Sequence, residues 1–203
     1  MKTLVIVDLQ KDFYLKSGAL YVKGAEVLPS RIAKRIKEGG FDNIIITLDS
    51  HPINHCSFTE NGGPWPKHCL KGSDGASISD KIFNVINELE STPRPNIVIV
   101  EKGCDSDKEE YGAFMGYNRF NNPFKYLFSN SIEKDIYDML QESEDIEVCG
   151  IAGDYCVLNT IKEMLKFLHS EQIYVNLNGV KSIDDGTTLD TFCTENDITC
   201  LKM

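Results

Sequence analysis

Residues 3–7 read T-L-V-I-V, an uninterrupted apolar run rich in β-branched side chains, and Asp8 follows it directly. Such a run, without alternating polar residues, is typical of a strand that is covered on both faces. Comparable runs recur along the chain, at residues 43–48 (N-I-I-I-T-L), 96–100 (N-I-V-I-V), 146–151 (I-E-V-C-G-I), 172–177 (Q-I-Y-V-N-L) and 198–201 (I-T-C-L). These runs predict six buried strands.

Helical patterns occupy the gaps between the predicted strands. Between residues 157 and 169, apolar side chains recur every three or four residues, as on one face of a helix. Similar patterns cover residues 25–38, 78–89, 132–141 and 189–195. Strands that alternate with helices predict an α/β fold. We therefore expect one doubly wound domain over residues 1–203, with about six mainly parallel strands in Rossmann-like order and helices on both faces.

Length and charge restrict the function classes. A chain of 203 residues suits one domain, and its 41% hydrophobic and 26% charged residues are ordinary for a globular protein. No apolar run is long enough to cross a bilayer, and Asp8 comes too early for a signal peptide. The net charge of −10 argues against nucleic acid and anionic lipid as partners. We expect a small-molecule substrate, no nucleic acid partner and no membrane partner.

The cysteines indicate a reducing compartment. There are seven, at positions 56, 69, 104, 149, 156, 193 and 200, and no two are spaced as Cys-x-x-Cys. An odd number of scattered cysteines without a signal peptide argues against a disulfide framework. We therefore expect a cytoplasmic protein whose cysteines are mostly buried apolar side chains, with one of them available as a nucleophile.

Three of the four histidines gather just after the second predicted strand. His51, His55 and His68 lie there with Asp49, which ends the strand. Imidazole and carboxylate are the ligands that a divalent transition metal takes in proteins. A polar loop with surface histidines is the simpler alternative. The clustering favours a metal site, and therefore an enzyme.

Other chemically useful residues follow the neighbouring strands. Asp8, Lys102 and Cys156 each stand at or just beyond a predicted strand end, where parallel sheets form their ligand crevice. Taken singly, they can be a turn residue, an exposed lysine and a buried thiol. Together they suit a cysteine nucleophile, its base and a cation that favours the thiolate. Backbone N–H groups near Ala152 and Cys156 could then bind an oxyanion.

Two segments, 54–77 and 103–131, are long for loops in an α/β domain. The second is rich in aromatic residues, most of which we attribute to packing or to a contact in a homo-oligomer. Only Tyr111 and Phe114 are kept as site candidates.

The motifs that carry these residues resemble a known family. They are V-D-L-Q-K-D-F (7–13), D-x-H-P-x-x-H-x-S-F (49–58), G-G-x-W-P-x-H-C (62–69), E-K-G (101–103), Y-G-A-F (111–114) and G-x-A-x-D-Y-C-V (150–157). In this order they resemble the nicotinamidases (pyrazinamidases) of the isochorismatase-like cysteine hydrolases. The Asp, Lys and Cys frame alone indicates the superfamily, and the metal cluster indicates the nicotinamidase branch.

The resemblance implies roles for residues of this chain. Asp8, Lys102 and Cys156 would be the catalytic triad. Asp49, His51 and His68 would bind one divalent ion, for which we expect zinc, with iron and manganese as alternatives. His55 is an additional candidate ligand, and Glu60 is its rival. The side chains of Phe13, Trp65, Tyr111 and Tyr155 would wall a pocket for a flat aromatic ring. A cis peptide bond is expected between Ile151 and Ala152.

The activity implied is hydrolysis of nicotinamide to nicotinate and ammonia, a step of NAD salvage. The metal would hold the pyridine nitrogen, and Cys156 would form a thioester. One alternative is another hydrolase of the superfamily, acting on a different small amide or a vinyl ether. A second is a non-catalytic metal or redox module on the same fold. Two features depart from the family pattern: Gly153 stands where many relatives have Thr, and segment 103–131 is longer and more aromatic.

Overall fold

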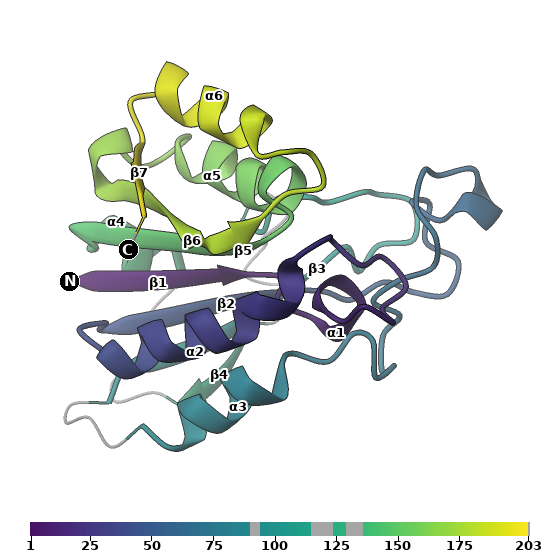
Figure 1. The fold of residues 1–203 in the computed structure, drawn as a ribbon, viewed down its shortest axis with the longest axis horizontal. Coiled ribbons are helices and arrows are strands. Elements are labelled where there is room, and N and C mark those ends of the chain that lie inside the picture. The colour runs from purple at the N-terminus through teal and green to yellow at the C-terminus, as the bar shows by residue number, and fades with distance from the viewer. Residues whose placement is uncertain (90–93, 115–123, 129–135, 203) are drawn as a thin grey trace.

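One sheet organises the chain (Figure 1). The computed structural model describes residues 1–89, 94–114, 124–128 and 136–202. Seven strands in this part of the chain pair in the order β4-β3-β2-β1-β5-β6-β7. They are β1 (Lys2–Val7), β2 (Asn43–Asp49), β3 (Asn96–Lys102), β4 (Phe124–Phe128), β5 (Asp145–Ile151), β6 (Ile173–Lys181) and β7 (Thr199–Leu201).

Six of these strands are parallel and coincide with the six predicted runs. Their order reverses beside β1, which lies between β2 and β5. Numbered among themselves, the parallel strands follow the Rossmann order 3-2-1-4-5-6. The predicted fold class is confirmed.

Strand β4 was not predicted. It is antiparallel to β3, with Val100 opposite Phe124 and Ile99 opposite Lys125. It lies inside segment 103–131, which the sequence suggested was a long excursion. An antiparallel edge strand on a parallel sheet is a common variation, and here it shortens the excursion.

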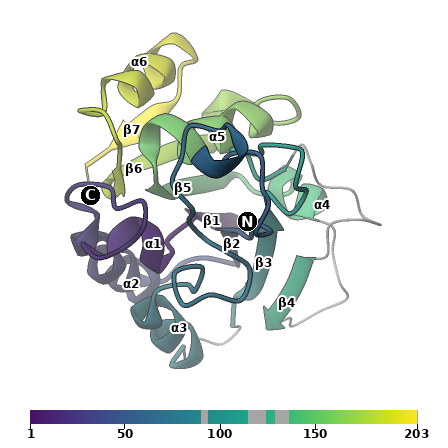
Figure 2. The same cartoon turned by 90° about the vertical axis from the view of Figure 1, so that its right-hand side faces the viewer.

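Helices cover both faces of the sheet (Figure 2). Residues Leu4 and Ile6 of β1 face one helical layer, whereas Val5 and Val7 face the other. This alternation follows from the two-residue period of a strand. The first layer contains α2 (Leu28–Glu38) and α3 (Asp80–Asn87), and the second contains α4 (Ile136–Gln141), α5 (Leu158–Met164) and α6 (Thr187–Glu195).

The short elements lie mostly near the ends of the strands. They are α1 (Lys11–Tyr14), the turns of 3-10 helix η1 (Ala25–Val27), η2 (Thr59–Asn61) and η4 (Ser170–Gln172), and a π-helical turn, η3 (Gly153–Val157). Long loops after β2 and β3 gather beyond the carboxyl ends of the strands, on the right in Figure 1. No helix among the described residues is long and apolar enough to span a membrane.

Candidate active site

Three side chains from adjacent strand ends form one buried cluster. Asp8 follows β1, Lys102 ends β3, and Cys156 lies just beyond β5. The ammonium of Lys102 lies 2.9 Å from Asp8 Oδ2 and donates a hydrogen bond to Cys156 Sγ at 3.6 Å. The exposed fractions are 0%, 2% and 7% for Asp8, Lys102 and Cys156. The structure therefore brings together the nucleophile, base and cation that the sequence suggested.

The backbone aims Asp8 at this cluster. Asp8 has a φ of 49°, a left-handed conformation that is uncommon for a residue with a side chain. Thr47 Oγ1 donates a hydrogen bond of 2.6 Å to Asp8 Oδ1. The second oxygen, Oδ2, faces Lys102 as an ion-pair partner and has no hydrogen bond among the described residues. That oxygen is available to accept a proton.

Cys156 lies on the π-helical turn η3, between β5 and α5. The peptide bond between Ile151 and Ala152 is cis, as the resemblance implied. The carbonyl of Ala152 accepts hydrogen bonds from the N–H groups of Tyr155 and Val157, at 3.1 and 3.0 Å. The N–H of Cys156 lies on the same turn, between these two donors in the chain.

Burial governs the titration of this cluster. It raises the pKa of the Cys156 thiol well above its usual range, against the opposing effect of the Lys102 ammonium. Burial and the Lys102 ammonium thus act in opposite directions on the ionisation of this thiol. Burial also raises the pKa of Asp8, again opposed by Lys102. For Lys102 itself, burial is outweighed by Asp49 and Asp8, which raise its pKa well above its usual range.

Asp49 joins this cluster to the histidines. Its Oδ1 accepts a short hydrogen bond from Lys102, while its Oδ2 lies 3.5 Å from His51 Nε2 and 3.9 Å from His68 Nε2. Burial opposes ionisation of Asp49, but Lys102 and His51 outweigh it and lower its pKa. Burial lowers the pKa of His68, whereas the Asp49 carboxylate overcomes burial at His51 and raises its pKa.

The arrangement of Asp49, His51 and His68 fits a divalent metal ion. One potential ligand atom from each lies within 4.8 Å of the others. His51 Nδ1 lies 2.9 Å from the carbonyl of Gly103, and His68 Nδ1 lies 2.8 Å from that of Pro66. A carbonyl partner keeps the proton on Nδ1 and leaves the Nε2 lone pair for a metal. Carboxylate and imidazole ligands at this spacing suit bonds of about 2.0–2.2 Å to one ion.

Charge supports the same conclusion. The two carboxylates, Asp8 and Asp49, share a single buried cation, Lys102. With both carboxyl groups ionised and both imidazoles neutral, the cluster would carry one net negative charge. Buried charge without a partner is costly, and a divalent cation would offset it.

Gly103 allows the imidazole of His51 to lie close to the backbone of residue 103. Its φ is 63°, and a Cβ at this position would lie 2.4 Å from His51 Cε1. A side chain would therefore displace the imidazole. This accounts for the glycine of the E-K-G motif.

His55 and Glu60 have other partners in this arrangement. His55 Nδ1 lies 2.7 Å from Ser57 Oγ, and its Nε2 lies 3.1 Å from the carbonyl of Lys108. Its ring packs against His51 with the centroids 4.1 Å apart. Glu60 forms an ion pair with Lys67 at 2.5 Å, and its side chain is 64% exposed. His55 also forms a group with His51 and Glu109 in which one potential ligand atom from each residue lies within 4.8 Å of the others.

An aromatic-walled pocket opens beside the cluster. Its lining includes Asp49, His68 and Cys156 together with Phe13, Trp65, Tyr111 and Tyr155, the four residues expected to hold a flat ring. Trp65 Nε1 donates a hydrogen bond of 3.0 Å to Tyr111 Oη. The ring of Tyr155 lies 5.1 Å from that of Trp65 and 5.5 Å from that of Tyr111, between centroids. These contacts make the aromatic wall a connected unit.

Sequence reasoning missed part of the pocket and misassigned one residue. Leu20, Val22, Glu109 and Ile183 also line it. Burial, followed by the Asp49 carboxylate, raises the pKa of Glu109. Phe114 does not line the pocket; it is 1% exposed and packs in the core under α4 and α5. Other aromatic residues of segment 103–131, such as Tyr117 and Phe120, lie outside the described residues.

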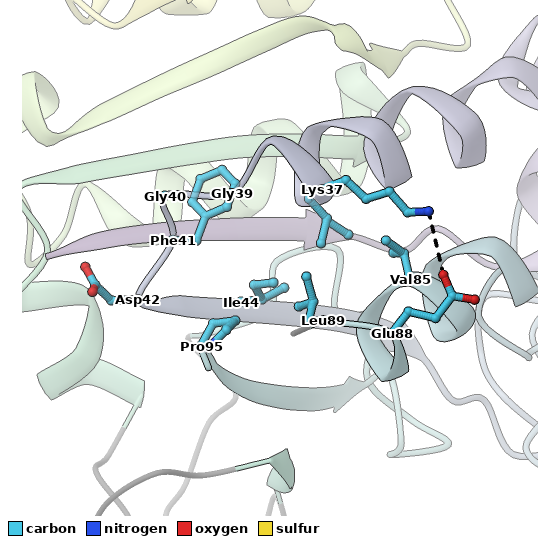
Figure 3. A pocket seen from close by; sticks show the side chains of 11 residues that line it. Lys37, Gly39, Gly40, Phe41, Asp42, Ile44, Val85, Glu88, Leu89 and Pro95 are labelled. Atoms are coloured by element: carbon cyan, nitrogen blue, oxygen red, sulfur yellow. Dashed lines mark ion pairs between the residues drawn. The ribbon is translucent and has the colours of Figure 1, made fainter. Parts of the chain in front are cut away.

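A wider hollow lies at the opposite end of the sheet, where β2 begins (Figure 3). Figure 3 shows Phe41, Ile44 and Leu89 around it, with an ion pair of 3.6 Å between Lys37 and Glu88 at its edge. None of the residues expected to act in the site lines this hollow. The convergence of titratable groups, and not the size of the hollow, therefore identifies the candidate site.

Comparisons with known proteins agree with this geometry. No family model matches the chain. A curated nicotinamidase of Acinetobacter baylyi is 30% identical over 202 residues, which cover 89% of this chain and 81% of the relative. The chain belongs to the nicotinamidase family. As a member of this family it is an amidohydrolase.

Solved structures extend the family likeness to the whole fold. PnC1 from L. infantum, in complex with nicotinate, has a TM-score of 0.77 and 28% identity, covering 100% of this chain and 92% of that one. The pyrazinamidase of Pyrococcus horikoshii, in complex with zinc, has a TM-score of 0.72 and 28% identity, covering 100% and 99%. The amidohydrolase fold is thus shared from end to end.

Proposed function

We propose that this chain hydrolyses nicotinamide to nicotinate and ammonia, as a step of NAD salvage, with Cys156 as nucleophile. The observation that carries the proposal is the contact of Lys102 with Asp8, Asp49 and Cys156 at the base of an aromatic-walled pocket. One cation thereby connects the thiol and its base to the metal-ligand cluster. The names of the relatives support nicotinamide as the substrate.

Asp8 acts first as the base. Because burial raises the pKa of the Cys156 thiol, its proton leaves only as Sγ attacks the carboxamide carbon. Asp8 accepts this proton, and its raised pKa brings it closer to the working range of a general acid and base. The lysine ammonium stabilises the charge that is transferred within the cluster.

Asp8 then acts as the acid. It gives the proton to the carboxamide nitrogen as the C–N bond breaks, so that ammonia leaves and a thioester remains on Cys156. Water next attacks the thioester carbon and gives a proton to Asp8. The C–S bond breaks, and the proton on Asp8 passes to the sulfur. The product leaves as nicotinic acid, whose carboxyl proton is lost to solvent or to ammonia, which gives nicotinate. Every proton taken up is thus returned within one turnover.

Two further contributions stabilise this reaction. The N–H groups of Cys156 and Ala152 would donate hydrogen bonds to the oxyanion that forms when the sulfur attacks. Asp49, His51 and His68 would hold a divalent ion, for which we propose zinc. Such an ion supplies a Lewis acid beside the pocket that can bind a ring nitrogen. The aromatic residues Trp65 and Tyr155 contact the faces or edges of the ring and orient it.

The test is ammonia release from nicotinamide by zinc-loaded protein, with pyrazinamide and an aliphatic amide assayed side by side. We expect turnover of nicotinamide, formation of nicotinate in equal amount, and little turnover of the aliphatic amide. Preferential hydrolysis of the aliphatic amide would contradict the proposed substrate. Absence of any amide hydrolysis would contradict the proposed function.

A further inference from the structure

We infer that Ile183 is a specificity-determining residue of this pocket and that Asp154 positions it. The inference rests on the proposed function, and it adds the size limit that the pocket imposes on its substrate. Ile183 follows β6 in the chain, far from the motifs that identify the family. Its side chain nevertheless lines the pocket together with Ala152, Tyr155 and Cys156.

The exposure of Ile183 places it at the rim. The residue is 49% exposed, whereas Cys156, at the base, is 7% exposed. One side of the isoleucine therefore borders the pocket while another borders solvent. A large apolar side chain in this position leaves no room for a substituent that extends beyond the ring of the substrate.

Asp154 ties the backbone of this rim to the nucleophile turn. Its Oδ1 accepts a hydrogen bond from the N–H of Ile183 at 2.8 Å, and its Oδ2 accepts one from the N–H of Asp184 at 2.9 Å. Asp154 belongs to η3, the turn that also carries Cys156. Both carboxylate oxygens are thus engaged in fixing the rim relative to the reacting sulfur.

Gly153 allows the same two segments to pack closely. A Cβ at this position would lie 2.2 Å from Ser182 Oγ and 2.9 Å from Val180 Cγ1. A side chain on Gly153 would therefore push away the segment that leads to Ile183. The glycine and the neighbouring Asp154 together seat this segment on the nucleophile turn.

Hydrogen bonds also fix the backbone that follows Ile183 in the chain. Asp184 accepts hydrogen bonds from the N–H of Gly186 at 2.7 Å and from the N–H of Thr188 at 3.1 Å, which fixes the start of α6. Ile183 is therefore held between β6 and α6 in a short, hydrogen-bonded connection. The backbone that carries this side chain is fixed, and the volume of the side chain sets a limit on substituents of the pyridine ring.

The experiment compares nicotinamide with nicotinamides that carry one methyl or ethyl group on a ring carbon, using zinc-loaded protein. For each substrate, kcat/KM is measured relative to nicotinamide. Ile183→Ala should raise this ratio by about tenfold or more for at least one substituted substrate, the discrimination that a pocket gains from one or two methylene groups. Ile53→Ala, at a 64% exposed isoleucine that does not line the pocket, should leave every ratio unchanged.

Asp154→Ala separates a positioning role from general destabilisation. It should shift the ratios in the same direction as Ile183→Ala, and the double variant should add little, because Asp154 acts through Ile183. Asp154→Asn, which retains one carbonyl acceptor, should restore part of the wild-type selectivity. Ratios that are additive in the double variant would contradict the positioning role.

The outcomes also separate this inference from the proposed function. Wild-type turnover with ratios that Ile183→Ala does not change overturns the inference and leaves the function standing. If wild-type protein does not hydrolyse nicotinamide, the function fails. The comparison is then made by calorimetry with nicotinate and its ring-methylated analogues. Equal relative affinities in the wild type and in Ile183→Ala, or no binding, would overturn the inference.

Discussion

The side-chain amide of Gln10 pairs with both backbone polar groups of Asp49. Its Oε1 accepts a hydrogen bond from the N–H of Asp49, and its Nε2 donates one to the carbonyl of Asp49, each at 2.8 Å. The same Nε2 donates to the carbonyl of Ala76 at 2.8 Å. Strand β1 ends at Val7, so this buried side chain takes the place of a strand neighbour for the end of β2. Gln10 thereby fixes the backbone of a proposed metal ligand.

A substitution at Gln10 should therefore weaken metal binding although it replaces none of the proposed ligands. Gln10→Glu retains the acceptor for the N–H of Asp49 but places a carboxylate against two carbonyl oxygens. We expect zinc affinity to fall by about 10–100-fold, the usual effect of losing an outer-shell partner. Competition with a chromophoric chelator measures it. Gln172→Glu, at a glutamine that bonds Ser143 instead, is the control and should bind zinc normally. Unchanged affinity in Gln10→Glu would show that Asp49 is held by other contacts.

Removal of the sulfur should separate catalysis from metal binding. In Cys156→Ala we expect turnover of nicotinamide to fall by several orders of magnitude, because the nucleophile is lost. The zinc content should stay at the wild-type level, since no proposed ligand changes. Cys104→Ser, at an exposed cysteine, should retain activity. Substantial ammonia release by Cys156→Ala would point to direct attack by water and would exclude the thioester.

Much of the fold could be predicted from the sequence, because most of its strands and helices carry a pattern in their own residues. Runs such as residues 3–7 and 43–48 are mostly apolar and rich in β-branched side chains, and helical patterns lie between the runs. Strand β4 carries no such signal: its pairing with β3 is nonlocal and antiparallel, and its aromatic residues suggested a loop or a contact surface. The meeting of Asp8, Lys102 and Cys156 was foreseeable once their strands were assigned, since parallel strands end at one edge.

Other parts of the site depend on contacts that no local pattern encodes. Gln10 contacts Asp49, which lies 39 positions further along the chain, and Asp154 contacts Ile183, which lies 29 positions further. The Lys102 ammonium was expected to favour the thiolate of Cys156. Burial raises the pKa of this thiol, and burial is a property of the folded chain that no local pattern encodes. Phe114 was misassigned for the same reason: its core position is set by packing against α4 and α5.

The ligand set can be tested one histidine at a time. His51→Ala and His68→Ala should each lose most zinc affinity, because each removes one of three proposed ligands. His55→Ala should retain zinc within a few-fold, because both of its ring nitrogens already contact Ser57 and Lys108. Equilibrium dialysis with zinc gives the affinities, and circular dichroism checks that each variant folds. A loss in His55→Ala as large as in His51→Ala would indicate a four-ligand site.

Lys102 should determine how the stability of the metal-free protein depends on pH. Lys102→Met leaves the buried carboxyl groups of Asp8 and Asp49 without their cation, so that protonation becomes the way to remove their charge. Breaking a buried pair in this way costs about 3–5 kcal/mol. We expect that loss in the free energy of unfolding at about pH 8, and a smaller loss at about pH 5.

The pKa values of Asp8 and Asp49 explain why Lys102→Met loses more stability at the higher pH. In the variant, the folded-state pKa of these carboxyl groups rises above the unfolded value. The variant is therefore least penalised below the unfolded pKa and loses stability as the pH rises through the folded one. In the wild type, Lys102 and His51 lower the pKa of Asp49 against burial, so the stabilisation from Asp49 is present above the unfolded pKa and is lost as the pH falls.

Urea unfolding of Lys102→Met and of the wild type at both pH values measures the difference in stability. Lys37→Met, which breaks the exposed pair with Glu88, should change stability by less than about 1 kcal/mol at either pH. Equal destabilisation of Lys102→Met at both pH values would mean that the carboxylates are compensated by a group other than Lys102.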